Sequence, residues 1–302
     1  MQLSLGIQPG HRHAATFAIL LTVAAVFLFT VMDTIAKWLM QSYPVEQIVW
    51  ARYSSHTLLM LLFIPAYGVR TVLWTRRPGG QFARGALMVG STLSFFAALS
   101  FISLTDAYAV TFSSPILVTL LSIPLLGEKI GVRRWSAMLV GFAGVLVVIQ
   151  PGSGIASAAS LLALLTALQH ALYQITTRKL SGSESALALL FYSSLVGTAV
   201  MSAWVPFVWQ TPTLWDGLVM SSLGLLGAVG HLILIRALTL APVSTTAPFG
   251  YLQLVWAIVF SFLLFGDVPN LPTLAGAFLV VASGLYIFRR TARLQAQRRP
   301  LA

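Results

Sequence analysis

Polar side chains recur at helical spacing inside the long apolar stretches of this chain. Between residues 158 and 179, Thr166, His170, Tyr173 and Thr177 repeat every three or four positions, which places them on one face of a helix. Polar groups in the middle of a bilayer cost free energy, so they face a cavity or a neighbouring helix. A face that combines hydroxyl, imidazole and phenol groups can bind a small polar molecule, and the imidazole can relay a proton near neutral pH.

Two further apolar stretches carry a polar stripe of the same kind. The first comprises Tyr108, Thr111, Ser114, Pro115 and Thr119, and the second comprises Thr246, Gly250, Gln253, Trp256 and Ala257. Pro115 removes one helix hydrogen bond near the middle of its segment, and the freed carbonyl can bind a ligand in a water-filled cavity. A packing kink satisfied by a serine or threonine hydroxyl is the alternative for this proline.

Three histidines, His56, His170 and His231, fall near the middle of apolar segments. Each can relay a proton or bind a carboxylate, and the alternative is a hydrogen bond between two helices. Four aromatic residues lie deeper than the membrane interface and can stack on a substrate: Phe95, Phe96, Tyr173 and Trp256. The candidate substrate-binding residues are therefore Phe95, Ser114, His170, Tyr173, His231, Gln253 and Trp256.

Three charged residues form a second candidate group. Asp33 and Lys37 are one helical turn apart and can neutralise each other, while Arg52 enters the next segment at a similar depth. These charges predict either an outer gate of ion pairs, which breaks when a cavity opens outward, or a static anchor. Asp33 is the only acid deep in an apolar segment, so it is also the sole candidate for proton exchange.

Ten stretches are long enough to cross a bilayer as helices, which takes about 20 apolar residues each. They cover residues 14–38, 45–67, 82–102, 106–126, 132–150, 158–179, 184–209, 213–239, 243–265 and 271–290. The predicted fold class is an all-α integral membrane protein with ten transmembrane helices. A hydrophobic content of 58% and a mean hydropathy of +0.88 exclude a soluble domain.

The basic residues lie almost entirely on one side of these helices. Sixteen of the 18 Lys and Arg residues share that side with two acids, a net charge of +14; the other side has two basic and five acidic residues, a net charge of −3. Arg84 is counted on the basic side because it flanks the second loop. The positive-inside bias makes the basic side cytoplasmic, so both termini are predicted inside and the loop at 151–157 outside. These basic residues lie at the membrane edges and act as topology anchors, so we expect no nucleic-acid partner.

The chain divides into two weakly similar halves, residues 14–150 and 158–290, followed by a basic cytoplasmic tail at 291–302. Leu126-Gly127-Glu128 matches Phe265-Gly266-Asp267 at an offset that is nearly constant along the chain. Each half has five helices, an odd number, so the second half is inverted relative to the first. A 5+5 inverted repeat is typical of transporters, because one fold in two orientations provides an inward-open and an outward-open state.

Ten helices in 302 residues, the inverted duplication and the two Gly-acid helix ends resemble the drug/metabolite transporter superfamily and, within it, the EamA-type branch. The resemblance covers residues 14–290 and is greatest to the bacterial aromatic amino-acid exporters. Gly266-Asp267 departs from the second Gly-Glu of that branch, because it keeps the charge on a shorter side chain. The resemblance implies a transporter of small metabolites.

Three functions stay open at this stage. The favoured one is a secondary transporter that exports small metabolites by alternating access, with aromatic or apolar amino acids foremost. The alternative is an efflux pump for drugs and lipophilic cations on the same fold, and the third is an intramembrane enzyme or structural subunit. The sixth to ninth helices have no Lys or Arg near the midplane apart from Arg236 toward the inner end, so the predicted cavity is neutral and phosphorylated substrates are disfavoured.

The motifs of several enzyme classes are missing from the sequence. It has no cysteine, no Walker A loop, and no His-Glu-x-x-His or Gly-x-Ser-x-Gly motif. We therefore expect no enzymatic activity, no cofactor and no metal. We expect a functional monomer in the bacterial inner membrane, whose partners are a small-molecule substrate and the lipid bilayer.

Overall fold

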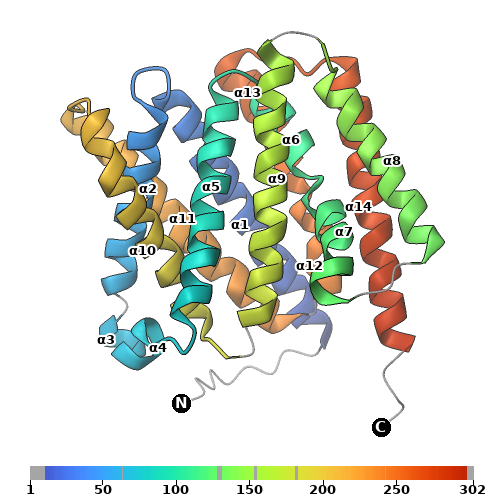
Figure 1. The fold of residues 1–302 in the computed structure, drawn as a ribbon, viewed down its shortest axis with the longest axis horizontal. Helices are drawn as coiled ribbons and strands as arrows, with labels where there is room; N and C mark the ends of the chain where they lie inside the picture. Colours follow the sequence, from blue (N-terminus) through green and yellow to red (C-terminus); the bar gives the residue numbers. More distant parts are fainter. Residues whose placement is uncertain are drawn as a thin grey trace.

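The computed structural model describes residues 11–62, 64–127, 131–152, 155–180, 183–241 and 243–297. Within these ranges every regular element is helical, so the predicted all-α class is confirmed. The long helices run between two faces of the molecule (Figure 1). The first helix begins and the last helix ends at the same face, as an even number of crossings requires. We call this the inner face and the opposite one the outer face, following the charge pattern.

The first half contains five crossings. They are α1 (His11–Leu39), α2 (Val45–Leu62), α5 (Pro78–Leu99), the pair α6 (Leu104–Thr111) and α7 (Ser114–Leu126), and α8 (Val132–Ile149). The predicted helix at 45–67 ends earlier, because α3 (Ile64–Tyr67) and α4 (Val69–Leu73) form separate short helices before α5.

The second half repeats this arrangement. Its crossings are α9 (Ile155–Leu180), α10 (Ala186–Trp204) with a 3₁₀ turn at Val205–Phe207, α11 (Leu214–Leu240), the pair α12 (Val243–Gly250) and α13 (Leu252–Phe265), and α14 (Leu271–Gln297). The predicted helices at 106–126 and 243–265 are therefore each interrupted. The predicted tail at 291–302 begins as a continuation of α14, and its residues 298–302 lie outside the described ranges.

Nine helices in the described part of the chain are long and apolar enough to cross a membrane. The one predicted crossing outside these nine is α2, the second along the chain. It is more polar, and its buried residues include Gln47, Arg52 and His56. It packs against α10 and α11 in the body of the molecule, which explains how a helix with so many polar groups is accommodated (Figure 1). Polar side chains on such a helix meet protein rather than lipid.

Both halves end their fourth crossing with the same glycine cap. Gly127 and Gly266 have φ values of 69° and 70°, in the left-handed region that glycine adopts without steric cost. The Asp267 N–H donates back to the Ser261 carbonyl at 3.0 Å and closes the end of α13. The repeated Gly-acid motif is thus a helix C-cap in both halves. In the second half the acid of this motif is Asp267, which can contact other parts of the molecule. Its counterpart in the first half, Glu128, lies outside the described ranges.

Glycines also permit the closest contacts between the repeats. A Cβ at Gly144 of α8 would lie 2.8 Å from the carbonyl oxygen of Gly276 in α14. Gly224 of α11 lies directly against α2, where a side chain would collide with the Arg52 carbonyl. Small residues let membrane helices approach closely and gain van der Waals contact. The two halves are therefore joined at the level of the backbone along α8–α14 and α2–α11.

The topology can be tested directly, because the chain has no cysteine of its own. Ser42 is exposed in the loop after the first crossing, and Ser183 follows the sixth. We expect Ser42→Cys to react with an impermeant thiol reagent in intact cells, and Ser183→Cys to react only after permeabilisation. Labelling of both positions from outside would contradict the ten-helix topology. Ser153, in the predicted outer loop, lies outside the described ranges.

Candidate functional site

The fourth crossing of each repeat is interrupted, and the two interruptions meet. α6 is separated from α7 by Phe112 and Ser113, and α12 is separated from α13 by Tyr251. The ring centroids of Phe112 and Tyr251 lie 5.1 Å apart. Pro115 stands in the first turn of α7, so it starts a new helix rather than kinking a continuous one. Interrupted helices at matching positions of two repeats are typical of transporter binding sites, because unwound backbone can bind a ligand.

A buried polar centre lies beside these interruptions and joins the repeats. Tyr108 of α6 donates a hydrogen bond to the Asp33 carboxylate of α1 and accepts a 2.7 Å bond from Gln253 Nε2 of α13. The Phe95 ring packs on Tyr108 with centroids 5.2 Å apart, and Phe112 stacks on it at 5.9 Å. Asp33 and Tyr108 are both buried. Of the predicted site residues, the structure thus brings Asp33, Gln253 and Phe95 together around one phenol.

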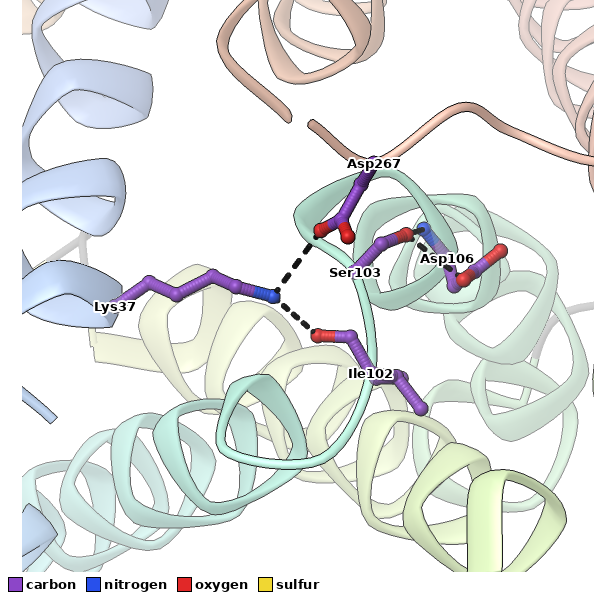
Figure 2. A network of polar contacts seen from close by, with 5 residues as sticks. All are labelled: Lys37, Ile102, Ser103, Asp106 and Asp267. Atoms are coloured by element: carbon purple, nitrogen blue, oxygen red, sulfur yellow. Dashed lines mark hydrogen bonds and ion pairs between the residues drawn. The ribbon is translucent and has the colours of Figure 1, made fainter. Parts of the chain in front are cut away.

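Lys37 joins the two repeats near the outer face, whereas Asp33 bonds to Tyr108. Lys37 Nζ lies 3.7 Å from Asp267 Oδ2, just beyond α13, and donates a 2.7 Å hydrogen bond to the Ile102 carbonyl between α5 and α6 (Figure 2). The expected i,i+4 pair between Asp33 and Lys37 is thus replaced by two separate contacts. The reason is that each side chain reaches a partner on another helix or loop.

Other hydrogen bonds between the repeats reinforce the outer face. They are Tyr43 Oη to Asp216 Oδ2 (2.6 Å), Gln47 Nε2 to the Gln210 carbonyl (2.7 Å) and Thr273 Oγ1 to Asp106 Oδ1 (2.5 Å). Ser103 caps α6 by accepting from the Asp106 N–H at 3.0 Å, which holds Asp106 in place (Figure 2). In this conformation the outer ends of the two repeats are in contact.

Arg52, the third predicted gate residue, lies against α5. Its Nη1 donates to Thr92 Oγ1 at 3.1 Å, and its guanidinium carbon lies 5.5 Å from the ring centroid of Tyr53 and 5.6 Å from that of Phe96. These four residues all belong to the first repeat. Among the three predicted gate residues, Lys37 alone has a described ion pair that links the two repeats.

The remaining predicted residues fall into separate clusters. His231 Nδ1 lies 2.7 Å from the Gly227 carbonyl of its own helix, and its ring centroid is 6.2 Å from that of His56. Trp256 packs edge-on against Phe27 with centroids 5.1 Å apart. The contacts of the His231 ring with His56 and of Trp256 with Phe27 fill space between helices.

Two other predicted residues, Ser114 and His170, lie along α9 and its neighbour α7. The Ser114 hydroxyl accepts a 3.3 Å hydrogen bond from Gln174 Nε2. The His170 ring centroid is 5.7 Å from that of Tyr173 on the same helix. Tyr173 in turn is one of the residues that connect this part of α9 to α5.

Two pockets lie beside the α12–α13 interruption. One of about 480 Å³ is lined by residues of α12, α13 and α14 together with Thr105, and one of about 160 Å³ lies beside Phe112, Tyr251 and Gly284. None of the seven predicted substrate-binding residues lines either pocket. A central cavity lined by those seven residues therefore stays a prediction.

Arg84 is the residue that the sequence reading missed, because the positive-inside count treats it as an anchor. Its side chain is 2% exposed. Nε donates to Thr177 Oγ1 at 2.7 Å, and Nη2 donates to the Tyr173 hydroxyl at 2.6 Å. Nη1 donates to the Ser193 hydroxyl at 2.6 Å and to the Leu189 carbonyl at 2.5 Å. The lack of basic residues near the midplane of the sixth to ninth helices predicts neutral surroundings for Tyr173. The structure instead places the positive charge of Arg84 against it.

One signal in the sequence points to this burial. Arg84 is the seventh residue of α5, so it lies about 9 Å along the helix axis from Pro78. Gln81 precedes it by one turn on the same face. An anchor at the membrane surface does not need a second polar residue beside it.

We predict that Tyr108→Phe lowers stability, because it removes the hydroxyl shared by Asp33 and Gln253 and keeps the ring. Loss of a partner for buried polar groups costs about 1–3 kcal/mol. Thermal unfolding in detergent measures the effect. Tyr286→Phe is the matched control, because that side chain is 45% exposed and should unfold at the wild-type temperature. Equal unfolding temperatures for the two variants would contradict the role assigned to the Tyr108 hydroxyl.

Comparison with known proteins identifies several similar transporters. The chain is similar to an S-adenosylmethionine uptake transporter from Rickettsia bellii, at 29% identity over 84% of this chain and 87% of the relative. It is also similar to a pseudopaline exporter from Pseudomonas aeruginosa (28% identity, 90% and 95% covered) and to a riboflavin transporter from Vibrio cholerae (25%, 96% and 99%). A solved crystal structure matches with a TM-score of 0.61 at 19% identity, over 92% of this chain and 99% of that one, and shows the same fold.

The family match covers both halves. The EamA-like transporter family matches residues 16–150 and 157–289. With the repeat, the interrupted helices and the apolar crossings described above, this match decides the class of protein. The chain belongs to the EamA-like transporter family and is a multi-pass membrane transporter rather than an enzyme.

Proposed function

We propose that the protein is a secondary transporter that exports small amphipathic metabolites by alternating access, with amino acids of large apolar or aromatic side chain as the favoured class. The observation that carries this proposal is the centre where the interrupted helices meet, with Tyr108 bonded to Gln253 across the repeats. A carrier must hold its substrate where both repeats can reach it, and this centre satisfies that condition.

The chemistry of the centre favours an aromatic or apolar substrate with polar groups. Phe95, Phe112 and Tyr251 supply rings on which an apolar or aromatic moiety can stack. The amide of Gln253 and the hydroxyl of Tyr108 supply hydrogen bonds that fix orientation. The other predicted substrate-binding residues stand on α7, α9, α11 and α13: Ser114, His170, Tyr173, His231 and Trp256.

The relatives support a metabolite rather than a defined amino acid. Two of the named substrates, S-adenosylmethionine and riboflavin, contain fused aromatic rings, which agrees with an aromatic-lined centre. One relative is named for uptake and another for export, so relatives of this fold work in both directions and direction follows the gradients. The bacterial sources of these relatives support a bacterial inner membrane, and the charge asymmetry supports cytoplasmic termini.

Efflux of drugs or lipophilic cations is the second candidate, and Asp33 is the observation that favours it. This carboxylate is buried and bonds to the phenol at the same centre. A buried acid can balance a cationic substrate or exchange a proton. The gate that we propose contains Asp33, Lys37 and Arg52, so a cation pump would use one of its members for substrate recognition.

The two candidates differ in a transport assay. We expect liposomes containing the purified protein to exchange internal for external labelled phenylalanine, and we expect tryptophan to compete with it. Protein-free liposomes are the control. Exchange of a labelled lipophilic cation, with no exchange of phenylalanine, would favour the drug pump and direct attention to Asp33.

The role of the centre is tested by Gln253→Ala. We expect exchange to fall severalfold or more, because loss of a hydrogen bond of this kind costs about 1–3 kcal/mol, while the protein stays folded. Gln210→Ala is the matched control, because that side chain is exposed on the outer loop. Unchanged exchange in Gln253→Ala, and equally in His170→Ala, would show that the substrate binds elsewhere.

A further inference from the structure

The proposed function leaves one buried charge unexplained. Arg84 donates four hydrogen bonds, and every acceptor is neutral. The acceptors are the hydroxyls of Thr177 and Ser193, the phenol of Tyr173 and the backbone carbonyl of Leu189. Its guanidinium carbon also lies 4.5 Å from the ring centroid of Tyr173. Within the described residues, no carboxylate lies at ion-pair distance from Arg84. The one ion pair among all the described residues joins Lys37 to Asp267. A permanent cation is thus buried without a counter-ion among the described residues.

A second buried group lies on the same helix face. Gln81 is fully buried, one turn before Arg84, and neither its amide nitrogen nor its amide oxygen has a hydrogen-bond partner. Buried polar atoms are rarely left unpaired unless water or a ligand completes them. Two buried polar side chains therefore share one turn of α5. Among the described residues, Arg84 lacks a negatively charged partner and Gln81 lacks hydrogen-bond partners.

The chemistry of this pair is specific. A guanidinium binds a carboxylate through two parallel N–H···O bonds, which add the attraction of opposite charges and a fixed geometry to hydrogen bonds from an ionised donor. An amide can add one donor to the same carboxylate. A neutral acceptor gains only the hydrogen bonds and not the attraction of opposite charges, and a purely cationic group is repelled.

We propose that Arg84, assisted by Gln81, binds the carboxylate of the transported substrate in the inner half of the path. This inference rests on the proposed transport function and narrows its substrate class to molecules that carry an anionic group. It also assigns a second role to Tyr173, which holds the guanidinium until the carboxylate replaces the phenol.

The position of Arg84 links binding to movement of the repeats. Its own helix, α5, belongs to the first repeat, and its acceptors lie on α9 and α10 of the second. A carboxylate that takes over one N–H pair releases the corresponding bond between the repeats. Substrate binding thus weakens the contact that holds α5 to α9 and α10.

The test measures ligand binding rather than transport. Full-length protein in lipid nanodiscs is heated with 3-phenylpropionate, with its uncharged amide, 3-phenylpropanamide, or with phenyl phosphate. We expect 3-phenylpropionate to raise the unfolding temperature and to bind at least tenfold more tightly than the amide. Equal affinity for acid and amide, or no binding of the acid at millimolar concentration, would overturn the proposal. Tighter binding of phenyl phosphate than of the carboxylate would assign the site to phosphates and overturn the carboxylate assignment.

Three variants connect the preference to Arg84. In Arg84→Gln the preference for the acid should disappear, and in Arg84→Lys it should be reduced, because an ammonium keeps the charge and loses the planar fork. Arg70→Gln, at an exposed arginine on the inner side, is the matched control and should keep the full preference. A full preference in Arg84→Gln would contradict the assignment.

Tyr173→Phe covers the case in which Arg84→Gln does not fold. It removes one neutral acceptor and keeps the positive charge, so the acid should bind severalfold more tightly, whereas a purely structural network predicts no gain. The phenylalanine exchange assay separates this inference from the proposed function. Exchange that persists in Arg84→Gln would overturn the site and leave the function standing, and acid preference without exchange would do the reverse.

Discussion

The buried charge of Arg84 determines how α5, α9 and α10 pack. A guanidinium in a low-dielectric interior needs a partner for its N–H groups, since an unpaired buried charge costs several kcal/mol. Helix α5 cannot supply these acceptors, so Thr177 of α9 and Ser193 of α10 converge on it. Close approach is possible because Gly85 follows Arg84, and a Cβ at Gly85 would lie 2.6 Å from Val196 Cβ. Arg84 is thus one of the constraints that hold α5 against α9 and α10 at this end.

Hydroxyl groups show the opposite behaviour, because their own helix can satisfy them. Thr166 Oγ1 donates to the Leu162 carbonyl at 3.0 Å, and Thr177 Oγ1 donates to the Tyr173 carbonyl at 2.7 Å. Serine and threonine in helices commonly bond to the carbonyl four residues before them, so a stripe of hydroxyls does not by itself mark a cavity. Amides, phenols and cations have no such local solution. They therefore supply many of the contacts that cross from one repeat to the other.

This difference explains what could be predicted from the sequence. Helix periodicity and the Gly-acid caps are local, so the helices, the repeat and the transporter class followed from them. The candidate residues Gln253 and Phe95 also lie beside the helix interruptions. The pairing of Lys37 with Asp267 could not be predicted. The sequence shows that Asp33 lies one helical turn from Lys37, but it does not show that Asp267 comes close in the fold. Arg84 was assigned to the surface for a similar reason: spacing reports depth along a helix, but not which neighbours receive a side chain.

Two contacts between the repeats that involve a basic side chain, Lys37 with Asp267 and Arg84 with α9 and α10, differ in how easily they can open. The Lys37 and Asp267 side chains are 15% and 39% exposed, and an ion pair with that access to water contributes little, so water can replace it when the outer face opens. Arg84 has no such replacement, because it is buried among neutral acceptors. Separating α5 from α9 and α10 would leave its charge without partners unless another acceptor arrives first. A bound anionic group is such an acceptor, so the inner contact favours movement of the loaded carrier over the empty one. If Arg84 binds the substrate as we propose, the two faces have different tasks: the outer contact closes the path, and the inner contact makes its opening depend on substrate.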